Sequence, residues 1–284
     1  MSSVAYLFIS PHLDDVASSC GGYVRRLAMQ GERVIMLTAV TADPLPGAHL
    51  SKLAQRNHAA WRLGDAPFEP RRCEDMAAAQ LLGADYVHFG LPDAMYRCDM
   101  DGRPLYSRIR GVSVAQADWK HYAPLLRQKL AQAMETCGQP VQVFCPLTVG
   151  DHVDHLIVRH VVESLCDSLH IAYYEDYPYA DQPAAVRRAL KGDKALESWR
   201  SIKIELAPSE VEARIAAVAC YRSQVPGLFP SVTEQIQEIM STHLPVIGRY
   251  LAPRLALQAS NARMEACLRA YMARAGGERY WQRG

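Results

Sequence analysis

Apolar and polar positions follow two different periods along the first two thirds of the chain. Short apolar runs rich in β-branched and aromatic residues are typical of buried strands, and they alternate with longer stretches whose apolar residues recur every three to four positions, as in helices. The runs predict strands at 4–10, 33–40, 86–89, 141–146, 171–175 and 202–206. The longer stretches predict helices at 21–30, 51–63, 74–82 and 119–136, and one more within 148–165.

This order of elements predicts an α/β fold, a Rossmann-like open and mostly parallel sheet with helices on both faces. The run at 202–206 alternates apolar and charged residues, as an edge strand does. Beyond it, helical patterns at 210–222, 232–240 and 255–273 predict a helical C-terminal portion, with a Pro/Gly break at 225–230. We expect one domain over 1–284, with its core at about 4–230, the helical portion at about 231–284, and a long loop at 93–117.

Composition narrows the functional classes. The chain has 31 Lys and Arg against 30 Asp and Glu, a net charge of +1, and no basic run interleaved with aromatic residues, which argues against nucleic-acid binding. No secretory signal or membrane-spanning run is recognisable, so we expect a cytoplasmic protein without a membrane partner. Eight cysteines without a C-x-x-C pair fit reduced thiols, most of them small core residues.

The first candidate for chemistry follows the first predicted strand, in the segment HLDD. His12, Asp14 and Asp15 come at the carboxyl end of this strand, where ligands bind in open parallel sheets. The alternative is structural, because an aspartate at this place can cap the helix that follows while His12 is an ordinary loop histidine. The segment by itself leaves both interpretations open.

A second segment, GDHVDH, follows the strand at 141–146 and therefore opens onto the same edge of the sheet. If this turn is helical, His152 and His155 share a face. Two histidines and a carboxylate that meet in one crevice are the usual ligands of a catalytic zinc, with one position left open for water. Other divalent metals also accept imidazole and carboxylate ligands, so zinc is a preference.

At these motifs the chain resembles the LmbE-like, or PIG-L-type, de-N-acetylases. His12-Leu13-Asp14-Asp15 is similar to the family's H-P-D-D or H-x-D-D, and the segment from His152 to His155 to its H-x-x-H. The segments RRCEDMAAAQLLGA (71–84), LPD ending at Asp93 and YRSQ (221–224) are similar to further family features, and the resemblance covers about 4–230. Leu13, Val16 and Gly150 depart from it; Gly150 stands where some members have an aromatic gate, which affects how the substrate is enclosed.

The resemblance implies roles for individual residues. It implies that His12, Asp15 and His155 bind Zn²⁺, that Asp14 is the general base, and that His152 assists the oxyanion and the leaving amine. Asp154 either orients one of the imidazoles or is simply an acid at a helix N-terminus. The implied reaction is hydrolysis of an N-acetyl or other N-acyl group on a small molecule that contains an amino sugar.

Substrate contacts are predicted less directly. Asp93 and Tyr96 are candidates to bind sugar hydroxyls, and the tyrosines at 173–179 are candidates to stack on a sugar face. Arg71 is a candidate for an anionic group, although we expect it to pair with Glu74 on a helix surface. We expect Arg97 and Arg103 to lie in a solvated loop.

Two other functions remain open at this stage: an amidase for a larger N-acyl or thiol-conjugate substrate, and a non-catalytic protein that binds a sugar or a metal. The presence of Asp14 argues against the second, because a binding protein needs no base. A homo-oligomer is compatible with the sequence.

Overall fold

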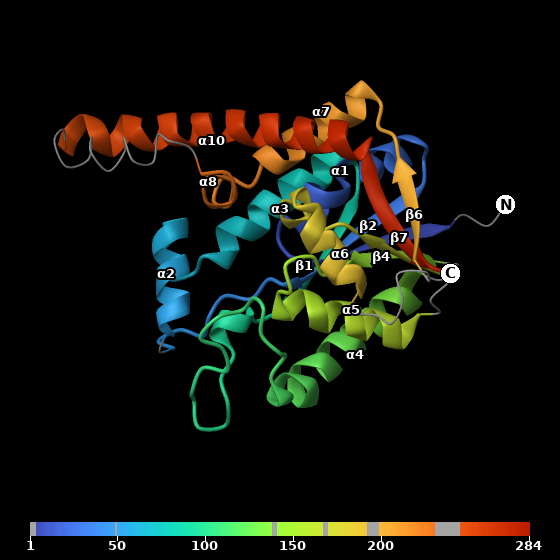
Figure 1. The fold of residues 1–284 in the computed structure, drawn as a ribbon. Helices are drawn as coiled ribbons and strands as arrows, with labels where there is room; N and C mark the ends of the chain where they lie inside the picture. The colour runs from blue at the N-terminus through green and yellow to red at the C-terminus, as the bar shows by residue number, and fades with distance from the viewer. Residues whose placement is uncertain (1–3, 49, 138–140, 167–169, 192–198, 231–244) are drawn as a thin grey trace.

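One seven-stranded sheet forms the centre of the protein (Figure 1). The computed structural model describes residues 4–48, 50–137, 141–166, 170–191, 199–230 and 245–284. The strand order is β3-β2-β1-β4-β5-β7-β6. The first five strands are parallel, and β7 runs antiparallel to both β5 and β6. The strands are β1 (Ala5–His12), β2 (Arg33–Val40), β3 (Asp85–Leu91), β4 (Val141–Pro146), β5 (Ile171–Tyr174), β6 (Trp199–Ile204) and β7 (Glu278–Arg283).

Helices cover both faces of this sheet, as the alternating pattern predicts. The helices α1, α3 and α7 pack together on one face, and α4 and α5 pack together on the other (Figure 1). Their bounds are α1 (Asp15–Met29), α2 (Lys52–Trp61), α3 (Phe68–Leu82), α4 (Ala123–Cys137), α5 (Val153–Leu165), α6 (Pro183–Lys191), α7 (Pro208–Ala219), α8 (Val225–Leu228) and α10 (Pro245–Ala275). None of the described helices is long and apolar enough to span a membrane.

Successive side chains of β1 point to opposite faces of the sheet, so each face packs against its own layer of helices. Leu7 and Ile9 belong to the apolar cluster that includes residues of α4 and α5, whereas Phe8 belongs to the cluster with α1 and α3. Phe8 stacks on Phe144 of β4 with ring centroids 4.3 Å apart. Because both faces of the central strands are buried, their sequences are almost continuously apolar.

Close packing against α7 and against the segment between β6 and α7 explains the two adjacent glycines within α1. A Cβ on Gly21 would lie 3.1 Å from Cγ of Arg214, and one on Gly22 would lie 2.4 Å from Cδ1 of Leu206. Arg214, which is fully buried, forms an ion pair with Glu278 at the start of β7. The Glu278 carboxylate also accepts the backbone N–H groups of Gly22 and Tyr23, so the C-terminal strand is fixed both to α7 and to α1.

The structure differs from the sequence-based expectations in several elements. The strand β7 and the helix α6 were not predicted, so the C-terminal portion is not wholly helical: after α10 it ends in a strand inserted into the sheet. The helices α1 and α3 begin earlier than expected, at Asp15 and Phe68, and a short helix, α8, occupies the expected Pro/Gly break. The helix expected at 232–240 lies outside the described residues.

The cysteines also differ from expectation. All eight are free thiols, but only Cys20, Cys137 and Cys145 are buried, whereas Cys73 and Cys98 are exposed. The prediction of reduced thiols is consistent with the structure. Cys166, Cys220 and Cys267 are partly buried against the apolar clusters, so the prediction of core residues fails only for Cys73 and Cys98.

Candidate active site

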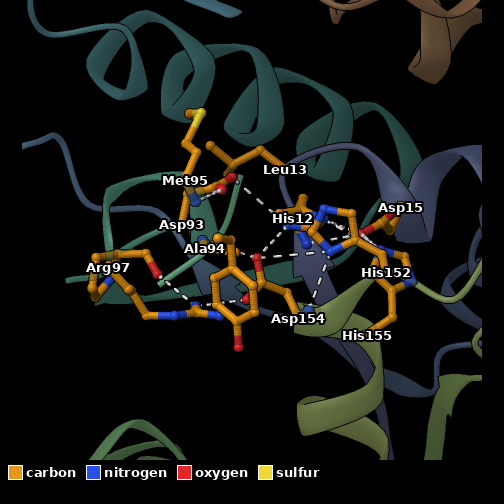
Figure 2. Close-up of polar contacts among 12 residues, drawn as sticks. His12, Leu13, Asp15, Asp93, Ala94, Met95, Arg97, His152, Asp154 and His155 are labelled. Carbon is orange, nitrogen blue, oxygen red and sulfur yellow. Dashed lines mark hydrogen bonds and ion pairs between the residues drawn. The ribbon is translucent and has the colours of Figure 1, made fainter. Parts of the chain in front are cut away.

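The two candidate motifs meet where the strand order reverses. β2 lies on one side of β1 and β4 on the other, and the crevice beyond such a reversal is where open α/β sheets bind ligands. His12 is the last residue of β1, and His152 and His155 lie at the start of α5, directly after β4. Figure 2 shows these side chains converging. A pocket of about 400 Å³ opens at this place.

Three donor atoms form a nearly equilateral triangle. Nδ1 of His12, Oδ2 of Asp15 and Nε2 of His155 are each 3.3 Å from the other two. Bonds of about 2.0–2.1 Å to a tetrahedral zinc ion place two ligand atoms about 3.3–3.4 Å apart. The triangle therefore has the size of three corners of a zinc coordination tetrahedron.

Carboxylates fix the orientation of the two imidazoles in this triangle. Nε2 of His12 is 3.0 Å from Oδ2 of Asp154, and Nδ1 of His155 is 2.6 Å from Oδ1 of Asp176. With a proton on each of these nitrogens, the other nitrogen of each ring presents its lone pair to the centre of the triangle. Sequence reasoning missed Asp176, although an acid directly after β5 at the same edge of the sheet is a usable signal.

The carboxylates around the triangle favour the protonated, positively charged forms of the two imidazoles. Burial lowers the pKa of both imidazoles, but neighbouring carboxylates outweigh it and raise the pKa of His12 to about 10 and that of His155 to about 9. Burial raises the pKa of Asp15, but the His155 and His12 imidazoles hold it well below its usual range. A divalent cation that replaces the two protons satisfies the same carboxylates.

His152 has a different hydrogen-bond pattern from the other two histidines. Its Nδ1 accepts the backbone N–H of Asp154 at 3.2 Å, so the imidazole caps the N-terminus of α5. In a neutral ring the proton then resides on Nε2, which can donate a hydrogen bond and offers no lone pair to a metal. Two other groups of residues also have possible metal-ligand atoms within 4.8 Å of one another. These groups are His12, His152 and His155, and His12, Asp93 and Asp154.

Asp14 lines the pocket in an unusual backbone conformation. Its φ is 120°, a region that non-glycine residues rarely adopt, and its side chain makes no capping hydrogen bond to α1. Burial and the Asp15 carboxylate raise the pKa of Asp14 to about 7. The structural alternative for this residue, a helix cap, does not apply.

A buried ion-pair network lies behind His12. Nη1 of Arg97 is 2.6 Å from Oδ1 of Asp154, and Nη2 of Arg97 is 2.9 Å from Oδ2 of Asp118. The guanidinium also stacks over the Tyr122 ring, with 4.1 Å to the centroid. Burial raises the pKa of Asp154, and Arg97 reverses this and keeps it below its usual range. The expectation of a solvated Arg97 is therefore wrong, whereas Arg103 is exposed as expected.

Only some of the residues predicted to contact the substrate line the pocket. Asp93 and Arg71 line the pocket, whereas Tyr96 is not among the lining residues; its hydroxyl is 2.5 Å from Nε2 of His58. Asp93 also accepts the backbone N–H of Met95 at 2.9 Å, and burial raises its pKa.

Arg71 was expected on a helix surface, which is wrong. It is 3% exposed, its guanidinium lies 4.5 Å from the centroid of the Trp61 ring, and Nη2 contacts the carbonyl oxygen of Leu13 at 3.3 Å. The expected partner, Glu74, instead accepts hydrogen bonds from Ser223. The helix is longer than predicted and turns this position toward the pocket.

The rest of the pocket comes from segments far apart in the sequence. Of the tyrosines at 173–179, Tyr177 and Tyr179 line it, while Tyr173 and Tyr174 are buried in the core. Ser223 and Gln224 of the YRSQ segment line it as well.

Comparison with known proteins gives the family. The family described as GlcNAc-PI de-N-acetylase, PIG-L, matches residues 7–166, which contain both motifs. The chain belongs to this family. The match ends with α5, so it includes the strands and helices that carry His12, Asp15 and His155.

Individual relatives of this PIG-L family protein are deacetylases. The 2'-N-acetylparomamine deacetylase of Streptomyces fradiae is 31% identical over 77% of the chain and 72% of the relative. The enzyme of the same name from Niallia circulans is 27% identical over 81% of the chain and 84% of the relative. Among solved structures, the zinc-inhibited form of teicoplanin deacetylase is similar with a TM-score of 0.65 and 25% identity, over 85% of this chain and 94% of that one.

Proposed function

We propose that this protein is a zinc-dependent hydrolase that removes the N-acetyl group from a small molecule containing an amino sugar. The observation that carries the proposal is the 3.3 Å triangle of Nδ1 of His12, Oδ2 of Asp15 and Nε2 of His155, with Asp14 and His152 beside it. The deacetylase relatives support the type of reaction.

In this proposal the three triangle atoms hold the metal, and Asp154 and Asp176 keep the two imidazoles in the ligating orientation. Imidazole and carboxylate ligands without thiolates are the donor set of a catalytic zinc with an open position. When bound, such an ion supplies Lewis-acid activation of water and of an amide carbonyl. The zinc-inhibited teicoplanin deacetylase adds support for zinc as an ion that binds to this fold.

The residues of this chain perform the proton transfers. Asp14, with a pKa raised to about 7, takes a proton from the attacking water and passes it to the nitrogen of the leaving amine. His152 keeps its proton on Nε2 and donates a hydrogen bond to the acyl oxygen as negative charge develops there. The amide C–N bond breaks, and acetate and the free amine leave.

Two measurements on the purified protein test the proposal. Elemental analysis gives the metal content per chain, and acetate release from a panel of N-acetylated amino sugars gives the activity, with and without a chelator. We expect close to one zinc per chain and release that stops with the chelator and returns with zinc.

Other outcomes would contradict it in different ways. A chain that binds no metal under any loading condition would refute the ligand assignment. A zinc-loaded protein that releases no acetate from any N-acetylated sugar, but hydrolyses larger N-acyl amides, would show that the substrate is wrong and the metal site right.

A further inference from the structure

The carboxylate of Asp154 orients the His12 imidazole, and contacts to both of its oxygens hold this carboxylate. Oδ2 is 3.0 Å from Nε2 of His12 and accepts the backbone N–H of Ala94 at 3.2 Å. Oδ1 forms an ion pair with Nη1 of Arg97 at 2.6 Å. Because both oxygens are in contact, the plane of the carboxylate is fixed, and with it the direction in which Nδ1 of His12 points into the triangle.

Arg97 lies on a different side of Asp154 from His12 (Figure 2) and is itself firmly held. Its Nε donates to Oδ2 of Asp118 at 3.1 Å, and its Nη2 is 2.9 Å from the same oxygen. Nη1 also donates to the carbonyl of Pro92 at 3.2 Å. The arginine thus joins Asp154 both to Asp118 and to the backbone directly before Asp93.

Asp118 is fixed in turn by groups of the long loop before α4. It begins a short π-helical turn, Asp118–Tyr122, and its Oδ2 accepts the hydroxyl of Tyr106 at 2.5 Å. The same hydroxyl accepts the backbone N–H of Ala115 at 2.9 Å. An unbroken series of buried contacts therefore runs from the start of α4 through Arg97 and Asp154 to the triangle.

Stability alone does not account for this series of charges. Removing charges from water often costs more than a buried ion pair returns, and apolar side chains of similar volume can stabilise a fold equally well. Here one arginine contacts two buried carboxylates, Asp118 and Asp154. The charges provide direction instead, because a guanidinium presents its donors in a rigid fork.

We propose that Arg97 is a positioning residue of the metal site, which fixes Asp154 and through it the ligand His12, so that the affinity for zinc depends on Arg97. This inference rests on the metal site of the function proposed above. Arg97 is not among the residues that line the pocket, so it contacts neither the ion nor the substrate. Without it, Oδ1 of Asp154 loses its ion pair and the carboxylate is free to turn away from His12. Among the described residues, no other arginine or lysine pairs with Asp154.

The zinc affinity of the full chain tests the inference. Competition with a chromophoric chelator gives the Kd for zinc of the unsubstituted protein and of Arg97→Gln. We expect Arg97→Gln to raise this Kd by about 10-fold, at the lower end of the effects of residues that orient metal ligands. With Co²⁺ as a second probe, the visible absorption of the bound ion should also change, because the direction of the His12 ligand changes.

A double-mutant cycle shows whether Arg97 acts through Asp154. Asp154→Asn by itself should raise the Kd for zinc by about 10- to 100-fold. In the Asp154→Asn protein, Arg97→Gln should change the Kd by less than about twofold, because the residue through which it acts is already altered. Losses that simply add would show a general effect of the substitution and would overturn the inference.

Two further variants control for damage to the fold. Arg214→Gln removes another buried arginine, which pairs with Glu278; urea unfolding should show a loss of stability, and the Kd for zinc should stay unchanged. Arg97→Lys keeps the buried charge without the fork, so it should fold even if Arg97→Gln does not, and it should still bind zinc more weakly than the unsubstituted protein. A Kd that is unchanged in every folded Arg97 variant, or raised equally by Arg214→Gln, would contradict the role of Arg97.

Because zinc affinity is measured without a substrate, this inference and the proposed reaction can fail separately. A Kd that depends on Arg97, in a protein that releases no acetate, would leave the positioning role standing and refute the deacetylase. Zinc-dependent acetate release by a protein whose Kd is independent of Arg97 would do the reverse. A chain that binds no zinc would overturn both.

Discussion

At the scale of single residues, the two adjacent aspartates have different environments. The Asp15 carboxylate contacts two imidazoles and accepts the backbone N–H of His12 at 2.8 Å, whereas Asp14 lines the pocket beside it. Neighbouring residues at a strand-to-helix turn point apart, and the φ of 120° at Asp14 is part of this turn. Such an unfavourable backbone conformation persists only where the surrounding structure fixes it, and residues of this kind cluster at active sites. The conformation of Asp14 therefore fits a functional position.

The separation of these roles gives a prediction for Asp14→Asn. The amide cannot accept the proton of water, so turnover should fall by roughly 10²–10⁴-fold, the usual contribution of a positioned general base. The zinc content should stay unchanged, because the triangle of donor atoms is intact. Acetate release and elemental analysis on the same preparation measure both quantities.

Asp151→Asn is the matched control for this substitution. Asp151 is exposed and lies directly before His152, so the same chemical change there should leave turnover unchanged. Full activity of Asp14→Asn, or loss of its zinc, would remove Asp14 from the role of base.

At the scale of elements, the connection from α10 to β7 decides how the chain ends. Gly276 and Gly277 join them with φ values of 72° and 122°. A Cβ on Gly277 would lie 2.1 Å from the backbone carbonyl oxygen of Ile204 in β6. Only glycine allows β7 to approach β6 at this turn, and β7 in turn brings Glu278 to Arg214 and to the backbone N–H groups of α1.

Gly277→Ala should therefore destabilise the protein by at least about 2 kcal/mol, since a clash with backbone is added to an unfavourable φ. Gly31→Ala is the comparison: Gly31 also has a positive φ of 82° but has no atom within 4 Å of an added Cβ. It should lose only about 1–2 kcal/mol, the conformational cost alone. Urea unfolding of the three proteins measures the difference, and equal losses for the two variants would show that the approach of β7 to β6 is unimportant.

At the scale of the whole molecule, the candidate metal site joins segments that are far apart in the sequence. His12 ends the first strand and His155 belongs to a helix more than a hundred residues later, and Nδ1 of His12 is 3.3 Å from Nε2 of His155. An ion held by both binds the folded chain and not the unfolded one. Its binding free energy is therefore added to the stability of the fold.

Zinc should accordingly raise the free energy of unfolding by about 2.7 kcal/mol when its free concentration is 100 times its Kd. His155→Ala removes one corner of the triangle and should abolish most of this gain, whereas His160→Ala, an exposed histidine on the same helix, should keep it. Thermal unfolding with zinc and with a chelator measures the effect. The same gain in His155→Ala as in the unsubstituted protein would place the ion elsewhere.

The α/β class, the parallel centre of the sheet and the two motifs at its edge follow from local patterns of residues along the chain. β2 and β4 have the predicted bounds because strands buried on both faces must be apolar throughout, which is a local signal. The two segments were expected to meet because the topology of a parallel sheet brings the carboxyl ends of its strands to one edge. The resemblance to the PIG-L family, and not the topology, singled out His12, Asp15 and His155 as the ligands.

Features that depend on partners distant in the sequence are visible only in the folded molecule. The strand β7 is stabilised by pairing with β5 and β6, which its own six residues do not encode. The burial of Arg97 and Arg71 follows from what packs around them, Asp154 and Trp61 respectively, and charged side chains by themselves predict exposure. For the same reason, the pairing of Arg110 with Tyr179 over Gly150 is visible only once the fold has brought the three segments together.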